Sequence, residues 1–524
     1  MPSCNLHTNF ISKIFIFVIS LATIIFLTLF LAPHSVTYTS NHEHVCDRAD
    51  ESNSISLVKT FLVKSLPQMK MAVESAGYMI RRTYDYKEKA ALDDCLELMD
   101  LSIDKVKDTL MDLANWSSVS DSANNVHTWL SGILTNHITC FEGIEHTSQD
   151  SIKNLIQDLI SKTRKSLAVL ACLANSDKRF LQPLNGRFPQ WALANIKDRK
   201  ILESWAGHKV KADVVVAQDG SGDYRTVREA VGSAPDRSKS RYVIHVKKGI
   251  YKENVEVGKK KKNLMIVGDG MNKTIITGSR NAADGSTTFK SAALAVAGDG
   301  FILQDICIQN TAGPEKHQAV ALRVSADRSV VNRCQIDAYQ DSLYTHSYRQ
   351  FYRDCSILGT VDFIFGDAAV VFQKCKIIAK KPLPNQKNMI TAQGRSDPNQ
   401  NTGTSIQDCK IIPSPDLELV GNLYSTFLGR PWREYSRTVV MESYIDKHVD
   451  PAGWAKWNGD FAVRSLYYGE YANRGPGSDT SGRVKWEGFH VITVPNEALK
   501  FTVGELIQGD VWLGSTGVSF NQGL

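Results

Sequence analysis

The chain has 524 residues, more than one ordinary hydrophobic core organises, so two or three folding units are expected. Its composition, with 43% hydrophobic and 22% charged residues, is that of a globular protein. Residues 41–200 hold 20 Lys and Arg against 21 Asp and Glu, whereas residues 201–524 hold 40 against 34. This basic excess suits a polyanionic partner and suits a merely soluble surface equally well. Nucleic acid is not favoured, because no basic run is interleaved with aromatic residues.

Residues 1–40 contain a strongly apolar segment. Residues 14–32 are 19 uncharged and mostly apolar residues, preceded by Lys13. That is just long enough to span a bilayer, and it is longer than the usual apolar core of a signal peptide. The rest of the chain is therefore expected to enter the secretory route, with the segment either cleaved as a signal peptide or retained as a membrane anchor of the precursor. In that compartment Asn115 and Asn272 are glycosylation acceptors, and the ten cysteines can form disulfides.

Residues 50–175 are predicted to be helical. Apolar residues recur at 3-4-3-4 spacing over 92–110, which indicates one buried helix face; they are Leu96, Met99, Ile103, Val106 and Leu110. Ser151 is a candidate cap for a later helix with its own apolar face. Cys95 and Cys140 are plausible disulfide partners. Such stripes predict a helical bundle and no activity by themselves.

Residues 176–208 are mixed, polar and contain proline, which is typical of a linker. The dibasic stretch at 199–202 is a site that a processing protease could reach.

From about residue 209 the pattern changes to short β-branched runs separated by Gly, Asp and Asn turns. The segments NRCQI, RDCSI, QKCKI and QDCKI share one pattern, and their cysteines are Cys334, Cys355, Cys375 and Cys409. A strand repeat of about 20 residues without a helical half indicates a parallel β-helix. The cysteines are interpreted mostly as small buried residues in a stacked ladder, although Cys355 and Cys375, on adjacent coils, are also candidates for a disulfide. The KKKK run at 259–262 is interpreted as a solvated turn.

Two aspartates are separated by one repeat length. Asp341 lies in YQDSLY (339–344) and Asp362 in GTVDFIFG (359–366), so they should stack about one coil apart, at ~5 Å. Two carboxylates this close cannot both ionise easily, so one pKa is expected to rise and the other to fall. The pair then supplies an acid and a nucleophile for attack on a carbonyl carbon. The alternative is that both merely hydrogen-bond to turn amides, but the apolar neighbours of Asp362 make an unpaired carboxylate costly there.

Other motifs supply the remaining groups of such a site. Arg430, in LGRPW (428–432), is expected to hold Asp362 ionised. Gln318, in QAVALR (318–323), and Gln340 offer neutral amide donors that suit an oxyanion hole. The aromatic candidates for stacking on sugar rings, each also explained by packing in the fold, are Tyr339, Tyr344, Phe363, Phe365, Trp432 and Trp454. Trp432 is the best ligand candidate among them.

No cofactor is expected. The chain has no CxxC pair, no HExxH and no EF-hand loop, so no metal site is predicted. A G-x-S-x-G elbow is also missing, which disfavours a Ser-His-Asp hydrolase.

Residues 209–520 resemble the plant pectin methylesterases, or pectinesterases. The resemblance rests on QAVALR, YQDSLY, GTVDFIFG, GIYKE (249–253) and LGRPWREYSRTVVM (428–441). It implies a right-handed parallel β-helix over residues 209–524. Residues 41–175 look like the all-α pectinesterase-inhibitor pro-region of the longer family members, and 199–202 resembles their processing motif.

The resemblance implies hydrolysis of methyl-esterified homogalacturonan in the plant cell wall to pectate and methanol. Asp362 would be the nucleophile, Gln318 and Gln340 would stabilise the oxyanion, and Asp341 would act as proton donor and then as base. Arg430 would orient Asp362 and contact substrate, together with Trp432 and Thr288. Separate proteinaceous pectinesterase inhibitors are implied partners.

The chain departs from the family pattern at several positions. Ser342 stands where Thr is usual and Asp367 where Asn is common, which adds a charge near Asp362. Of the two disulfide pairs of the pro-region, Cys95 and Cys140 fit the second, but Cys46 lacks its usual partner.

Two alternatives stand beside this reading. One is a different pectin-active β-helix, namely a calcium-dependent lyase or an inverting polygalacturonase, which would need other carboxylate constellations. The other is a pectin-binding or esterase-inhibiting protein with little activity of its own.

Overall fold

The computed structural model describes residues 51–114, 120–145, 147, 150–176 and 211–524. The apolar segment 14–32, Cys46, Asn115 and the dibasic stretch 199–202 lie outside this range. Within it, no helix is long and apolar enough to cross a membrane. Asn272 lies in an exposed turn between two strands.

The described part of the N-terminal region is a bundle of four helices. Their bounds are α3 (Glu51–Ile80), α4 (Tyr86–Ala114), α5 (Ser120–Ile144) and α6 (Asp150–Ser176). The predicted stripe of α4 faces the bundle core, where Met99, Ile103 and Val106 are buried. Because α6 begins at Asp150, Ser151 belongs to the first helical turn, and its prediction as the cap is wrong.

A disulfide joins two helices of this bundle. Cys95 of α4 and Cys140 of α5 are bonded, with their Cα atoms 4.5 Å apart. Both cysteines are buried in the bundle core. The link fixes α4 against α5, and both of these helices also contact the C-terminal region.

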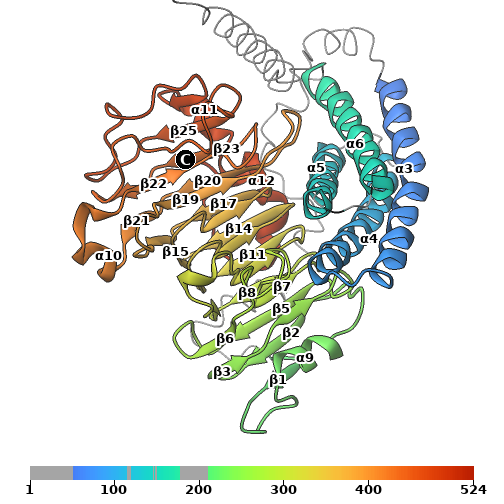
Figure 1. The fold of residues 1–524 in the computed structure, drawn as a ribbon, viewed down its shortest axis with the longest axis horizontal. Coiled ribbons are helices and arrows are strands. Elements are labelled where there is room, and N and C mark those ends of the chain that lie inside the picture. Colours follow the sequence, from blue (N-terminus) through green and yellow to red (C-terminus); the bar gives the residue numbers. More distant parts are fainter. Residues whose placement is uncertain (1–50, 115–119, 146, 148–149, 177–210) are drawn as a thin grey trace, which may run out of the picture. The chain divides into compact units, whose positions relative to one another are not determined.

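The C-terminal region is a right-handed parallel β-helix, whose coils stack along one axis (Figure 1). Its strands form three parallel sheets, which we name by their strand numbers. The eleven-stranded sheet consists of β1 (Val214–Val216), β2 (Tyr242–Val246), β5 (Leu264–Gly268), β8 (Ile302–Gln304), β11 (Ser329–Asn332), β14 (Arg349–Arg353), β17 (Ala369–Gln373), β20 (Gly403–Gln407), β23 (Arg437–Met441), β25 (Tyr467–Tyr471) and β26 (Phe489–Val491).

The other two sheets complete each coil. The eight-stranded sheet consists of β3 (Gly249–Lys252), β6 (Thr274–Gly278), β9 (Cys307–Asn310), β12 (Gln335–Asp337), β15 (Ser356–Gly359), β18 (Lys376–Ala379), β21 (Lys410–Pro413) and β24 (Tyr444–Ile445). The seven-stranded sheet consists of β4 (Val255–Val257), β7 (Leu294–Val296), β10 (Leu322–Val324), β13 (Leu343–Thr345), β16 (Ile364–Gly366), β19 (Asn388–Gln393) and β22 (Thr426–Gly429).

Short helices accompany the β-helix. They are α9 (Val227–Ser233), α10 (Pro415–Leu419), α11 (Pro495–Leu499), α12 (Val503–Ile507) and α13 (Gly509–Trp512). A capping box of Thr226 and Glu229 fixes the start of α9. Helix α12 buries apolar side chains against the outer face of the eleven-stranded sheet.

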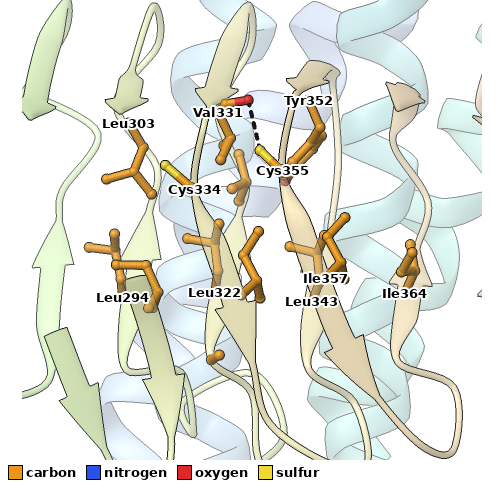
Figure 2. Packing of buried hydrophobic residues seen from close by; sticks show 14 of the residues in the cluster. Leu294, Leu303, Leu322, Val331, Cys334, Leu343, Tyr352, Cys355, Ile357 and Ile364 are labelled. Atoms are coloured by element: carbon orange, nitrogen blue, oxygen red, sulfur yellow. Dashed lines mark hydrogen bonds between the residues drawn. The ribbon is translucent and has the colours of Figure 1, made fainter. Parts of the chain in front are cut away.

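The core of the β-helix is built from columns of like residues. Leu294, Leu322, Leu343 and Ile364 are paired in register on four successive strands of the seven-stranded sheet (Figure 2). Each such contact buries apolar surface between coils, which is the main source of stability in a repeat architecture.

The repeated cysteines form a second column at one corner of the coil. The residue before each of them takes a left-handed conformation that turns the chain; these residues are Arg333, Asp354, Lys374 and Asp408. All four cysteines are buried free thiols, and the Cys355 thiol donates to the Val331 carbonyl oxygen at 3.3 Å (Figure 2). The possible Cys355–Cys375 disulfide is therefore not formed. The tight corner packs each thiol against the backbone of its own and the preceding coil, so the ladder interpretation accounts for these residues.

Candidate active site

The candidate site lies where successive coils enter the seven-stranded sheet. Gln318, Asp341 and Asp362 lie in the turns that precede β10, β13 and β16 respectively. Backbone hydrogen bonds stack these turns: the amide of Ala319 donates to the Gln340 carbonyl at 3.3 Å, and that of Asp341 to the Val361 carbonyl at 3.1 Å. The one-repeat spacing therefore places both glutamines and both aspartates on adjacent coils.

Arg430 binds Asp362 through two parallel hydrogen bonds. Its Nε donates to Oδ1 at 2.8 Å and its Nη2 to Oδ2 at 2.6 Å. Arg430 follows β22, two strands beyond β16 in the sheet order, so the side chain reaches back along the sheet. Such a bidentate pair fixes the carboxylate plane and favours its ionised form.

The two aspartates differ in electrostatic environment. Each is only 6% exposed. Burial and the neighbouring Asp362 raise the pKa of Asp341 well above its ordinary value, which favours the protonated form of that carboxyl group. Burial also raises the pKa of Asp362, while Arg430 counteracts the rise. The expectation that the pKa of Asp362 falls is therefore wrong, because desolvation outweighs the ion pair. The upward shift of the pKa is large only for Asp341, so Asp341 remains the candidate acid and Asp362 the candidate carboxylate.

Asp341 and Asp362 both have a left-handed backbone conformation. Asp341 has φ of 64° and Asp362 of 51°. This conformation raises the free energy of non-glycine residues, and among these residues Asp and Asn adopt it most readily. The turn thereby aims each carboxyl group outward from the coil, at the start of a strand.

These residues line a cavity of about 610 Å³. Thr288, Gln318, Gln340 and Trp432 share its lining with the aspartates and Arg430. All the substrate and catalytic residues expected from the sequence thus come together in one cleft. Both amide side chains are half-buried at its wall, as an oxyanion site requires.

The aromatic candidates separate into two groups. Tyr344, Phe365 and Trp432 line the cleft, and Tyr344 stacks on Phe365 with ring centroids 4.1 Å apart. The other three do not reach it. Phe363 is in the β-helix core, Tyr339 packs under the Lys380 ammonium, and Trp454 is 1% exposed and stacks on Tyr468; these three expectations are corrected.

Trp457 and Phe289 are cleft residues that the sequence reasoning missed. Trp457 is 38% exposed, and the Arg430 guanidinium lies 4.3 Å from its ring centroid. Phe289 is next to Thr288 and lines the same cavity. The proximity of Trp457 to Trp454 in GWAKWNGD was the available signal, but strand alternation could not say which indole faces outward.

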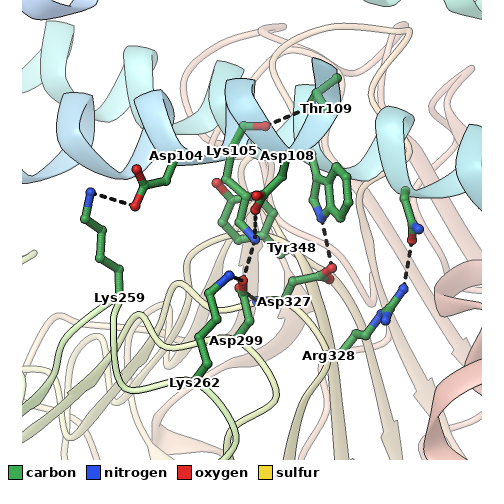
Figure 3. Close-up of polar contacts among 12 residues, drawn as sticks. Asp104, Lys105, Asp108, Thr109, Lys259, Lys262, Asp299, Asp327, Arg328 and Tyr348 are labelled. Carbon is green, nitrogen blue, oxygen red and sulfur yellow. Dashed lines mark hydrogen bonds and ion pairs between the residues drawn. The ribbon is translucent and has the colours of Figure 1, made fainter. Parts of the chain in front are cut away.

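The helical bundle forms the opposite wall of this cleft. Asp94 and Glu142 line the same cavity as the two aspartates, from α4 and α5. Glu142 pairs with Arg433, which follows Trp432 in the same loop. Polar contacts continue along the interface, where Lys105 of α4 donates to Asp299 at 2.7 Å and Trp129 of α5 to Asp327 at 3.1 Å (Figure 3).

The departures from the family pattern have clear structural settings. Asp367 accepts hydrogen bonds from Gln393, Gln400, Thr402 and, across the interface, Thr135 of α5. Burial raises its pKa to about 6. The Ser342 hydroxyl group donates a hydrogen bond to the Tyr339 carbonyl oxygen at 3.1 Å, so this side chain, which lacks the methyl group of Thr, has a hydrogen-bond partner.

No group of three or more His, Cys, Asp or Glu side chains arranged to hold a metal ion occurs in the part of the chain that the structure describes.

Comparison with known proteins decides the family. The family model described as Pectinesterase matches residues 213–510, more than half of the chain. The chain belongs to the pectinesterase family. A second model, described as plant invertase/pectin methylesterase inhibitor, matches residues 36–174.

Full-length relatives and a solved structure agree. The chain is 53% identical to a pectinesterase/pectinesterase inhibitor of Ficus pumila var. awkeotsang, over 97% of this chain and 96% of that protein. It is 59% identical to pectinesterase 3 of Solanum lycopersicum, over 90% and 86%. The solved pectin methylesterase from carrot is 59% identical, with a TM-score of 0.60, and covers 61% of this chain and 100% of its own. This pectinesterase is therefore a carboxylic ester hydrolase that acts on pectin.

Proposed function

We propose that Asp362 is the nucleophile with which this pectinesterase removes methyl groups from homogalacturonan. The observation that carries the proposal is the bidentate Arg430–Asp362 pair at the floor of the cleft. The pair keeps Asp362 ionised and aimed although it is buried, which a nucleophile needs and a merely structural turn residue does not. Burial and the charge of the neighbouring Asp362 raise the pKa of Asp341, which favours its protonated form.

In the first half-reaction, a carboxylate oxygen of Asp362 attacks the C6 ester carbonyl carbon. The negative charge that develops on the carbonyl oxygen is stabilised by the amide N–H groups of Gln318 and Gln340. The bond to the methoxy oxygen then breaks, and Asp341 gives that oxygen its proton, so that methanol leaves. An anhydride between the galacturonate and Asp362 remains.

In the second half-reaction, a water molecule attacks the anhydride at the sugar carbonyl. Asp341, now a carboxylate, takes a proton from this water. The bond to Asp362 breaks and its electron pair returns to the Asp362 carboxylate. The products are one free uronic acid, which loses its proton to the solvent to become a carboxylate, and the enzyme in its initial protonation state.

Trapping of the covalent intermediate tests this role. Turnover of highly methylated pectin in the presence of hydroxylamine should modify the Asp362 side chain to a hydroxamate, detected by peptide mass spectrometry. Modification should require substrate and should be much slower in Asp341→Asn, which lacks the proton donor for methanol. Hydroxylamine that attacks the sugar carbonyl instead forms a uronic hydroxamate and leaves Asp362 unchanged. Rapid turnover that forms neither hydroxamate would make Asp362 a base that activates water directly.

The bundle supports a second role, as a module that inhibits esterase activity. Its Asp94 and Glu142 line the catalytic cavity, so the docked bundle narrows access for a polysaccharide chain. We expect the full-length chain to be less active than residues 211–524 alone. Equal methanol release from both forms would remove this role.

We propose a maturation route and a location for the chain on the basis of its sequence. Cleavage at the dibasic stretch 199–202 by a processing protease would release the β-helix from the bundle, and the apolar segment 14–32 would direct the chain to the cell wall. Separate inhibitor proteins with a bundle of the same kind are the expected partners of the released enzyme. Mass spectrometry of the protein recovered from cell walls would locate both cleavage sites.

A further inference from the structure

The row of side chains that floors the cleft continues beyond the catalytic turns. In the seven-stranded sheet Phe365 pairs in register with Tyr344, and Tyr344 with Arg323. Side chains paired in this way point to the same face, ~4.8 Å apart on adjacent strands. Phe365 and Tyr344 line the cavity, so Arg323 lies one coil farther along the same face.

Arg323 is, in the described structure, a buried cation with one free hydrogen-bond donor. Its guanidinium lies 3.4 Å from the centroid of the Phe289 ring and it is 2% exposed. Its Nη1 donates to Ser325 at 3.2 Å and its Nη2 to Glu97 of α4 at 3.2 Å. The Nε atom is buried without a hydrogen-bond partner among the described residues, which leaves one more donor for an anion.

Lys290 and Lys259 extend this cationic row. Lys290 pairs with the other carboxylate oxygen of Glu97, and lies 3.9 Å from Glu256. Lys259, in the KKKK run, binds Asp100 at 2.8 Å and Asp104 at 2.9 Å. Figure 3 shows its pair with Asp104. The run is therefore an interface element rather than the solvated turn expected from the sequence.

The acids of α4 that meet these cations are regularly spaced. Glu97, Asp100 and Asp104 are three and four residues apart, which puts them on one stripe of the helix. Although burial raises the pKa of Glu97, Arg323 and Lys290 lower it below the ordinary value. The stripe thus presents a line of carboxylates to a line of cations that begins at the catalytic cleft.

We propose that Lys259, Lys290 and Arg323 form a binding site for the free carboxylates of de-esterified homogalacturonan, which the α4 stripe occupies in the full-length chain. A polyuronate also presents a line of carboxylates that need cationic partners. The esterase reaction itself produces such a chain. Methyl-esterified units are neutral and gain nothing from these cations. The inference rests on the proposed function, since a single polysaccharide chain crosses both the cleft and this site.

Binding of a fully de-esterified oligogalacturonate to residues 211–524 tests the proposal. The whole carrot chain aligns with 61% of this chain, a share close to the length of the β-helix, so we expect residues 211–524 to fold without the bundle. Calorimetry at low salt should show binding that weakens as salt is added. Lys290→Gln and Arg323→Gln should each weaken it about tenfold, the usual effect of losing one charge-assisted hydrogen bond. Lys376→Gln, an exposed lysine on the eight-stranded sheet, is the matched control.

Two further measurements separate the possible failures. Methanol release from highly methylated pectin should be equal in the wild type and in Lys376→Gln, which reports the proposed function, and the melting temperatures of Lys290→Gln and Arg323→Gln report their folding. The full-length chain should bind the oligogalacturonate at least tenfold more weakly than residues 211–524. Wild-type affinity in both Lys290→Gln and Arg323→Gln would overturn the site and leave these cations to the bundle alone. A wild type that binds but releases no methanol would contradict the esterase mechanism instead.

Discussion

The Arg430 guanidinium faces the Asp362 carboxylate edge to edge, with donor–acceptor distances of 2.8 and 2.6 Å. Each partner is buried enough that either charge alone would be costly. The pair therefore acts as a unit, and the chemistry of Asp362 depends on the geometry of Arg430.

Replacement of Arg430 by lysine should expose this dependence. Lysine keeps the charge but not the planar fork, so Asp362 loses stabilisation of its ionised form and its pKa rises further. Because the nucleophile must be ionised, the acid limb of the pH profile of kcat/KM should move to higher pH. Arg474→Lys, at an exposed ion pair with Asp408, should leave the profile unchanged. An unmoved acid limb in Arg430→Lys would show that another group controls it.

Asp341→Asn should separate the role of Asp341 in proton transfer from the role of its side-chain shape. Asparagine fits the left-handed turn and the pocket but cannot give a proton to methanol, so methanol release should fall by about 10²–10⁴-fold. Since the pKa of Asp341 is raised well above its ordinary value, the wild type should also lose activity as pH rises and this group ionises. Asp408→Asn, in the same left-handed conformation on another coil, should keep wild-type rates.

Gln340→Ala should remove one oxyanion donor. The expected loss in kcat is about 10²–10³-fold with little change in KM, because the charge appears only in the transition state. Gln335→Ala, five residues upstream on the eight-stranded sheet, is the control. A loss that appeared wholly in KM would make Gln340 a substrate-binding residue.

Two glycines of α5 offer a matched test of bundle docking. A Cβ atom on Gly132 would lie 2.1 Å from the Tyr348 ring, whereas on Gly143 it would meet only Ala91 at 3.8 Å. Both changes favour helix formation, so neither should unfold the bundle. Gly132→Ala should therefore weaken docking of the bundle over the cleft. Methanol release by the full-length chain should then rise toward that of residues 211–524, whereas Gly143→Ala should not change it. Identical activity of the two variants would show that the bundle does not limit access.

Asp94 should make docking of the bundle dependent on pH. Burial raises its pKa to about 7, and one of its carboxylate oxygens is without a hydrogen-bond partner in the described structure. The docked state therefore binds the proton more tightly, so its stability falls as pH rises from about 4 to 7 and then levels off. Asp94→Asn should raise the melting temperature at pH 7.5 and change it little at pH 4.5. Asp93→Asn, on the exposed side of α4, should alter neither.

The repeat spacing was sufficient for much of this architecture. The distances between Cys334, Cys355 and Cys375 predicted stacked coils, and the 21 residues between Asp341 and Asp362 placed two carboxylates on adjacent turns. Periodicity reports which residues share a coil, and these inferences needed nothing more.

Other features depend on contacts that periodicity does not encode. The outward orientation of Trp457, rather than Trp454, depends on a loop outside the repeat. The partners of the lysine run lie on a helix more than 150 residues earlier in the chain, so only the folded structure brings Lys259 to Asp100 and Asp104. The sign of the pKa shift of Asp362 depends on how far burial outweighs Arg430, which sequence alone cannot weigh.

The most direct test of the central claim is methanol release from highly methylated pectin by residues 211–524, measured beside Asp362→Asn. The substitution preserves the side-chain shape and the turn but removes the nucleophilic carboxylate. The account predicts rapid release by the wild type and a rate at least about 10³-fold lower for the variant. Equal rates from the two proteins would contradict the assignment of Asp362 as the nucleophile.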